Sequence, residues 1–204
     1  MEVPNAPKPV VFVYEALGTA LLLFAINMQN GEFFGQFGIA FMIFACLLIG
    51  GPITGAHYNP SVTVGVYLTN MKFREDLPMF LVMLAAQVVG GILGVMLVWA
   101  SLVNNNASSH TNAGVPTSEV ALLLPNAPNV SQVNTYMIEM VCTFVFVMIN
   151  LVFKIGKTSP TKESFLSCLA VALTLLAMIC VSGSKTGACL NPAVALAQTM
   201  YEVI

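Results

Sequence analysis

Charged side chains are scarce in this sequence. Only 8% of its 204 residues are Asp, Glu, Lys or Arg, and the formal net charge is −2. So small a charge says little about partners. The sequence also shows no glycine-rich nucleotide loop, no cluster of metal-ligating side chains and no nucleophile beside a base. We therefore expect no enzymatic activity, no cofactor, no metal ion and no nucleic-acid partner.

Paired cysteines are missing as well. The five cysteines show no CxxC spacing, and four of them lie inside apolar stretches. We interpret them as small buried hydrophobic residues rather than as disulfides or metal ligands. They are Cys46, Cys142, Cys168, Cys180 and Cys189.

Long apolar runs, in contrast, are abundant. Apolar residues make up 57% of the chain, and the mean hydropathy is +0.85, far above the values of soluble domains. Several blocks reach about the 20 residues that a helix needs to cross a bilayer. The sequence therefore predicts a multi-pass, all-α integral membrane protein. The predicted spans are residues 10–28, 36–53, 79–103, 136–153 and 164–181.

One nine-residue motif occurs twice. Residues 54–62 read TGAHYNPSV and residues 186–194 read TGACLNPAV, with six identities at a constant spacing of 132 residues. In each copy Asn is a favoured N-cap, and Pro is tolerated at the first helical position. The first such helix, residues 59–69, would cover only about half of a hydrocarbon core roughly 30 Å thick. The motif thus predicts two short helices that enter the membrane without crossing it.

The basic residues predict an orientation. If the first short helix re-enters, six of the seven basic residues lie on one side, which the positive-inside rule assigns to the cytoplasm together with the N-terminus. The polar loop 104–135 then lies opposite, where Lys185 is expected to be solvated. Glycosylation-type triplets start at Asn106 and Asn129 in this loop, and their modification stays open because such triplets also arise by chance. The six residues are Lys8, Lys72, Arg74, Lys154, Lys157 and Lys162.

The two halves of the chain face opposite ways in this assignment. A first repeat, residues 10–103, begins inside, and a second, incomplete repeat, residues 136–204, begins outside. An inverted repeat within one membrane domain, residues 1–204, places a solute site near the midplane. Each half also carries a carboxylate early in its first span and a Thr four residues later: Glu15 with Thr19, and Glu139 with Thr143.

These motifs resemble those of the aquaporin (major intrinsic protein) family, from about residue 10 to the last residue. The paired Asn-Pro-Ala boxes of that family correspond here to Asn59, Pro60 and Ser61, and to Asn191, Pro192 and Ala193. The resemblance implies an aquaporin-like helical bundle with two re-entrant half-helices. It also implies a homotetramer in which each chain has its own pore for water or small neutral solutes.

The physics of such a pore follows from the two facing helix N-termini. Their dipoles together amount to about one elementary charge, which disfavours cations and protons at the midplane. The side-chain oxygens of Asn59 and Asn191 would cap the helices and leave both NH₂ groups to donate to a solute. We expect backbone carbonyls of residues 51–58 and 183–190 to supply acceptors along the pathway.

Glu15 and Glu139 are ionisable groups inside predicted spans, so a proton relay is one interpretation. The other is that each carboxylate accepts hydrogen bonds from the backbone of a re-entrant loop. The symmetric placement and the family resemblance favour this second, loop-supporting role. His57 is expected to order its own loop and not to contact solute.

The sequence departs from the family at the constriction. Aquaporins usually carry Arg directly after the second box, and here that residue is Val194. Counting back without gaps places the other constriction positions on Ile39, Ile179 and Ala188, which are also apolar. Such a ring lacks side-chain donors and a fixed positive charge. We hypothesise a wider or drier filter that admits larger, less polar solutes or conducts water poorly.

Aquaporins also have a sixth span after the second short helix, and residues 192–204 leave no room for one. We expect either a truncated sequence or a wall supplied by another chain. Two functions therefore stay open. The paired Asn residues favour a passive channel, whereas the absent Arg and sixth span favour a structural membrane subunit that conducts poorly or not at all.

Overall fold

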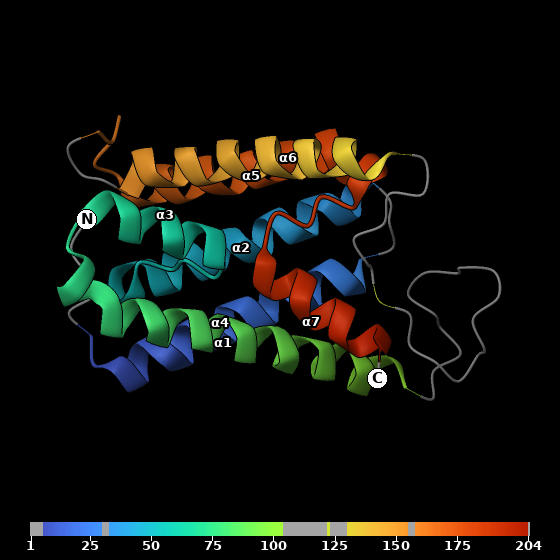
Figure 1. The fold of residues 1–204 in the computed structure, drawn as a ribbon, viewed down its shortest axis with the longest axis horizontal. Helices are drawn as coiled ribbons and strands as arrows, with labels where there is room; N and C mark the ends of the chain where they lie inside the picture. The colour runs from blue at the N-terminus through green and yellow to red at the C-terminus, as the bar shows by residue number, and fades with distance from the viewer. Residues whose placement is uncertain (1–5, 30–32, 104–121, 123–129, 155–157, 204) are drawn as a thin grey trace.

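The computed structural model describes residues 6–29, 33–103, 122, 130–154 and 158–203 of the chain. Most of the predicted loop 104–135, including Asn106 and Asn129, lies outside these residues. The described part forms a helical bundle (Figure 1). Its helices are α1 (Lys8–Met28), α2 (Phe33–Thr54), α3 (Pro60–Asn70), α4 (Phe73–Leu102), α5 (Gln132–Lys154), α6 (Ser164–Thr186) and α7 (Pro192–Val203).

Five of the helices have the length and apolar composition of membrane spans. These are α1, α2, α4, α5 and α6, whose most apolar windows have mean hydropathies between 2.0 and 2.5. The five predicted spans are thereby confirmed, and no sixth helix of this kind occurs among the described residues. The remaining two, α3 with 11 residues and α7 with 12, are too short to cross.

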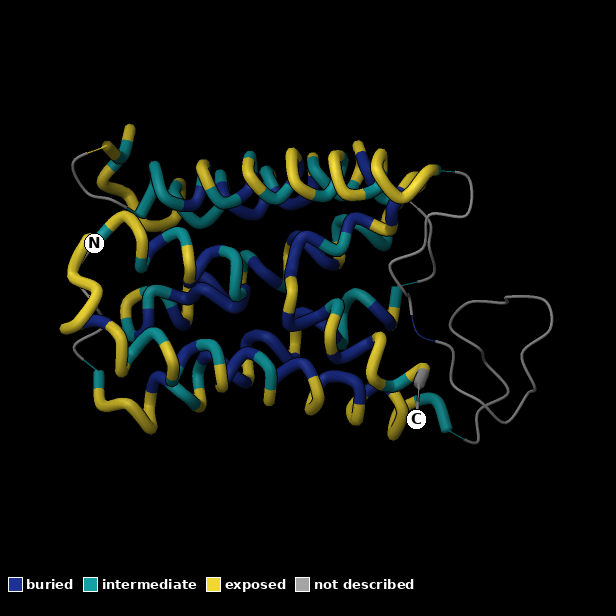
Figure 2. Tube along the Cα trace, viewed as in Figure 1, coloured by how far each residue is buried: buried dark blue, intermediate teal, exposed yellow. Residues whose placement is uncertain are grey.

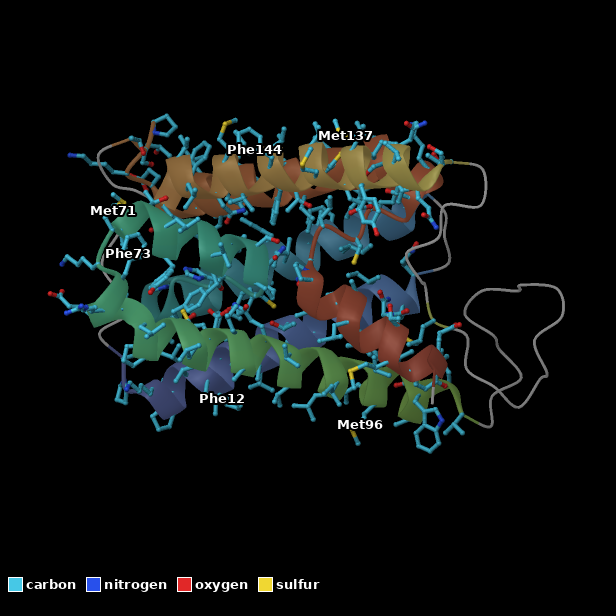
Figure 3. The ribbon with its side chains drawn as sticks, viewed as in Figure 1. Phe12, Met71, Phe73, Met96, Met137 and Phe144 are labelled. Atoms are coloured by element: carbon cyan, nitrogen blue, oxygen red, sulfur yellow. The ribbon has the colours of Figure 1, made fainter. Side chains whose placement is uncertain are left out.

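The outer surface of the bundle is apolar, as a bilayer requires. Buried positions face the interior, and the exposed positions lie mainly on the outward faces of the long helices (Figure 2). Phe144 on α5 is 65% exposed and Met96 on α4 is 59% exposed, and both point away from the bundle (Figure 3). Lipid tails, which are as apolar as these side chains, can cover such a surface without cost.

Two helices begin earlier than predicted. The third predicted span starts at residue 79, but α4 starts at Phe73 and contains Pro78. Acidic residues in its first turn complement the helix dipole, and Asp76 accepts a hydrogen bond from the Asn70 side chain at 3.1 Å. Similarly, α5 begins four residues before the predicted Tyr136. The hydroxyl oxygen of Ser131, which precedes the helix, accepts from the Asn134 backbone N–H at 3.3 Å, in the manner of an N-cap.

The ends of α2 and α6 correct a second expectation. α2 runs to Thr54 and α6 to Thr186, so residues 51–54 and 183–186 are helical. The Gly51 carbonyl accepts from the Gly55 N–H at 3.1 Å, and the Gly183 carbonyl accepts from Gly187 at 3.0 Å. Residues 51–54 and 183–186 form the last turns of these helices, so the irregular loops shorten to residues 55–59 and 187–191.

α3 and α7 lie inside the bundle with their N-terminal ends facing each other near its centre (Figure 1). α4 flanks both of them and also packs along α1, while α2 packs against α6 and α6 against α5. The α1–α4 contact is close, because a Cβ added to Gly90 would overlap the backbone carbonyl of Ala16. The long helices thus form a frame around two facing half-helices.

Candidate functional site

Asn59 and Asn191 cap the two short helices at the centre of the bundle. The Asn59 side-chain oxygen accepts from the Ser61 N–H at 2.8 Å, and Pro60 occupies the first helical position. The Asn191 oxygen accepts from the N–H groups of Ala193 at 3.1 Å and Val194 at 3.5 Å. Both caps therefore form as the sequence predicts.

The same two side chains also reach across to the opposite loop. The Asn59 NH₂ donates to the Leu190 carbonyl at 2.8 Å, and the Asn191 NH₂ donates to the Tyr58 carbonyl at 2.8 Å. A primary amide has two N–H groups. One of each pair is thus committed to the protein, and the expectation that both whole NH₂ groups face a solute is wrong. One N–H per Asn is left for that purpose.

The loops before the two Asn residues have nearly identical backbones. In the first, Gly55, Ala56 and Tyr58 have φ values of 81°, 49° and 51°. The equivalent residues of the second loop have φ values of 84°, 50° and 50°, at Gly187, Ala188 and Leu190. A left-handed conformation costs a non-glycine residue roughly 1 kcal/mol or more, so contacts elsewhere must stabilise both loops.

Glu15 provides that stabilisation in the first loop. Its carboxylate is fully buried and accepts from the Thr54 hydroxyl at 2.7 Å, the His57 N–H at 3.0 Å and the Tyr58 N–H at 2.8 Å. A fourth donor comes from α4, where the Gln87 amide reaches the same carboxylate at 2.9 Å. Four donors to one buried carboxylate compensate for the loss of its hydration.

Glu139 makes the corresponding contacts in the second loop. It accepts from the Thr186 hydroxyl, from the Cys189 N–H at 3.2 Å and from the Leu190 N–H at 3.1 Å. Glu139 is half-buried and borders an open groove between α5 and α7 that has a volume of about 490 Å³. Both carboxylates therefore bind loop N–H groups and a Thr hydroxyl, which is the geometry of the loop-supporting interpretation.

The sequence did not predict that two further side chains, Gln87 and Lys154, contact this site. Gln87 is fully buried and also donates to the Thr63 hydroxyl at 2.8 Å; that hydroxyl lies 3.1 Å from Nδ1 of His57. The sequence signal that could have identified Gln87 was the presence of a polar amide in an otherwise apolar span. Lys154 was assigned to a surface loop, but it is the last residue of α5, and its ammonium donates to the Ala56 carbonyl at 3.0 Å.

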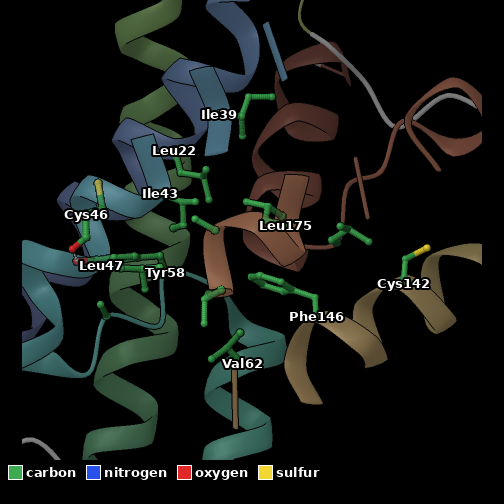
Figure 4. Close-up of a cluster of buried hydrophobic side chains, with 14 of the residues drawn as sticks. Leu22, Ile39, Ile43, Cys46, Leu47, Tyr58, Val62, Cys142, Phe146 and Leu175 are labelled. Carbon is green, nitrogen blue, oxygen red and sulfur yellow. Dashed lines mark hydrogen bonds between the residues drawn. The ribbon is translucent and has the colours of Figure 1, made fainter. Parts of the chain in front are cut away.

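A cavity of about 280 Å³ runs along the two Asn residues. All four predicted constriction positions line it, and within the described part of the chain no charged side chain does. Its floor is an apolar cluster in which Phe146, Leu175 and Leu22 lie close to Tyr58, whose hydroxyl donates to the Cys46 carbonyl at 2.9 Å (Figure 4). The lining includes Ile39, Ile179, Ala188, Val194, Asn59, Asn191, His57, Gln29, Gln36, Ser184 and Gln198.

Lys185 does not supply the missing positive charge of the constriction. It is exposed near the end of α6 and donates to the Val181 carbonyl of its own helix at 2.8 Å. Its ammonium is thus held by α6, and Lys185 is not among the residues that line the cavity. The four predicted constriction residues, Ile39, Ile179, Ala188 and Val194, thus line an apolar part of the cavity, and within the described chain no basic side chain lines it with them.

Comparison with known proteins agrees with this geometry. The family model described as "Major intrinsic protein" matches residues 8–203. The chain belongs to the major intrinsic protein family. Its members are membrane channels, so the chain is an integral membrane protein of a family without enzymatic chemistry.

Individual relatives are distant. Aquaporin NIP1-1 of Zea mays is 29% identical over 94% of this chain and 64% of its own length. Aquaporin-1 of Rhizophagus irregularis is 28% identical over 88% of this chain and 62% of its own length. Glycerol uptake facilitator protein-like 6 of Lactiplantibacillus plantarum is 25% identical over 93% of this chain and 83% of its own length.

The fold matches that of a solved structure, the aquaglyceroporin from Plasmodium falciparum. The TM-score is 0.78 at 21% identity, with 97% of this chain and 82% of that chain covered. The aquaporin-like fold expected from the sequence is therefore confirmed. The chain nevertheless covers only about 60% of the length of the first curated relatives it matches.

Proposed function

We propose that this protein is a passive channel for water or small neutral solutes, with the pathway running between Asn59 and Asn191. The observation that carries the proposal is the uncharged cavity of about 280 Å³ along these two side chains. Each amide keeps one N–H after its cross-loop bond, so two converging donors remain for a solute oxygen. A cavity of this size has room for several water molecules or one small polyol.

Electrostatics oppose the passage of cations through this cavity. The N-terminal ends of α3 and α7 both direct the positive ends of their dipoles at the Asn pair. No carboxylate among the described residues lines the cavity to offset them, because Glu15 and Glu139 are occupied by loop donors. Neutral solutes experience little of this field, and cations meet a barrier.

The apolar ring shapes the selectivity. Ile39, Ile179, Ala188 and Val194 offer no side-chain donor to replace the hydrogen bonds of an entering water molecule. We therefore propose that the filter favours solutes with apolar surface, such as glycerol or urea, over water. Val194 is 1% exposed and Ile39 is 4% exposed, so both side chains are fixed by packing.

We further propose how the surrounding parts are organised. Glu15 and Glu139 serve as supports of the two loops rather than as proton relays, with His57 ordering the first loop. Residues 10–103 form one repeat and residues 136–204 the second, in a single channel domain in which residues 104–135 are extracytoplasmic. The N-terminus is cytoplasmic, and four copies of the chain assemble into a homotetramer in the bilayer.

A structural subunit with little or no flux is the second candidate. It is favoured by the open groove of about 490 Å³ beside α7, which leaves one side of the second loop uncovered. In such a subunit the Asn pair would serve only to join the two loops, and the apolar ring would keep the cavity dry.

Flux measurements on the full-length protein in proteoliposomes separate these functions. We expect stopped-flow light scattering to show glycerol and urea permeabilities above those of empty vesicles, with a smaller gain for water. The variant Val194→Arg should lower the ratio of glycerol to water permeability, because it returns a donor and a charge to the ring. Permeabilities equal to those of empty vesicles would overturn the channel and favour the structural subunit.

A further inference from the structure

One face of α5 extends the wall of the cavity toward the end of that helix. Phe146 lines the cavity, and Asn150 and Lys154 follow at intervals of four residues, which places all three on one side of the helix. Asn150 is 2% exposed, so this face points into the bundle. At 1.5 Å per residue, Lys154 lies about 12 Å further along the helix than Phe146.

Lys154 lies beside the end of the cavity. In the first loop His57, Tyr58 and Asn59 line the cavity, and the Lys154 ammonium donates to the carbonyl of the preceding residue, Ala56, at 3.0 Å. The ammonium is also close enough to interact electrostatically with His57 and Glu15. A positive charge from α5 is therefore bonded to the first re-entrant loop, directly before the loop residues that line the cavity.

The acceptor that Lys154 occupies belongs to the short row of loop carbonyls that a solute would use. In this row the Gly51 carbonyl accepts from the Gly55 N–H, and the Tyr58 carbonyl accepts from the Asn191 side chain. The Ala56 carbonyl is occupied in the same way by Lys154. A polar solute leaving the cavity here must compete with the ammonium for a carbonyl.

Among the residues that the structure describes, no Lys or Arg side chain is bonded to a carbonyl of the second loop. Ala188, the counterpart of Ala56, lines the cavity, and the one lysine near it, Lys185, is bonded to its own helix. The family's usual Arg position at this end is the apolar Val194. The fixed positive charge of the pathway is thus located at the opposite end from the apolar ring.

We propose that Lys154 is the specificity-determining residue of the pathway at this end. Its side chain restricts neutral solutes, because they must displace it from the Ala56 carbonyl, and its charge disfavours cations. This inference rests on the proposed channel function and adds a second filter to it. A half-buried Lys with a flexible stem suits this role, since the ammonium can exchange the carbonyl for water as a solute passes.

Three variants of the full-length protein in proteoliposomes test the proposal. Lys154→Ala should raise urea and glycerol permeability about fivefold, which corresponds to about 1 kcal/mol in the barrier. Lys154→Gln keeps a donor and much of the length but removes the charge, so it should raise the ratio of guanidinium to urea permeability. Lys162→Ala removes an exposed lysine near the start of α6 and should change neither quantity.

The outcomes distinguish this proposal from the channel function itself. A conducting wild type with an unchanged or slower Lys154→Ala variant overturns the role of Lys154 alone, and an unchanged guanidinium-to-urea ratio in Lys154→Gln overturns its charge selection. A wild-type protein without solute flux, together with a conducting Lys154→Ala variant, supports the role of Lys154. If the wild type and every variant lack solute flux, and circular dichroism shows that Lys154→Gln is folded, both the role of Lys154 and the channel function are overturned.

Discussion

The two re-entrant loops have the same backbone shape in different surroundings. Their left-handed residues agree within 3° in φ, and each loop is bound by one carboxylate. Yet Glu15 is fully buried and has a fourth donor from Gln87, whereas Glu139 is half-buried, has three described donors and borders a groove. The shape of such a loop is therefore set by its own residues and one carboxylate, and the fourth donor adds stability without changing the shape.

Removing the carboxylates should produce the largest difference between the halves. Glu15→Ala leaves four donors without their partner in a dry interior and should cost roughly 3 kcal/mol or more. Glu139→Ala should cost about half as much, because water entering from the groove can satisfy its donors. Thermal unfolding in detergent, followed by circular dichroism, measures both. Equal losses would mean that the surroundings of the two carboxylates do not matter.

The Asn pair should behave symmetrically instead. Asn59→Ala and Asn191→Ala each remove one helix cap and one cross-loop bond of 2.8 Å, so each should cost about 2 kcal/mol. The two losses should also be strongly non-additive, since either substitution separates the same pair of loops. A double-mutant cycle measures the coupling. Fully additive losses of stability would contradict the idea that the two cross-loop hydrogen bonds together hold the loops to each other.

Gln87→Met should make the first half resemble the second. The substitution keeps the length of the side chain and leaves Glu15 with three donors, and we expect a loss of about 1 kcal/mol. In this background the cost of Glu15→Ala should fall toward that of Glu139→Ala. Unfolding of the single and double variants provides the comparison, and a cost of Glu15→Ala that does not fall would show that Gln87 is not the source of the difference.

The smallest effect is expected at Lys185. Its ammonium bonds only to a carbonyl of its own exposed helix end, so Lys185→Ala should change stability by less than about 0.5 kcal/mol and leave solute flux unchanged. Lys154, which bonds to a loop carbonyl of the other half, should affect flux. A Lys185→Ala variant with altered selectivity would show that a cation serves this end of the pathway too.

Much of the fold could be read from local sequence patterns. The five spans follow from apolar runs, and the caps at Asn59 and Asn191 follow from Asn-Pro preceding a helix. The family's motif spacing also located four apolar residues that line one cavity. Each of these features depends on neighbouring residues or on the repeated motif.

The missed features depend on contacts between distant segments or on weak local signals. Gln87 donates to Glu15, which is 72 residues away, and Lys154 donates to Ala56, which is 98 residues away. The neighbours of these two residues in their own helices do not identify the distant partners. The early start of α4 escaped because Pro78 and the adjacent charges resemble a loop. For each Asn, the N–H that bonds to the opposite loop was expected to face a solute, because its acceptor belongs to the other half of the chain.

The crosswise bonds of Asn59 and Asn191 also bear on how the protein is made. The two residues and their acceptors are separated by more than 130 positions. When the first half enters the membrane during synthesis, the Asn59 amide has no acceptor yet, and an unpaired donor in hydrocarbon is costly. The emerging second half relieves that cost. The two Asn amides therefore reach their full hydrogen bonding only when both halves are in place, and a chain halted after α4 would carry an unpaired polar group at its centre.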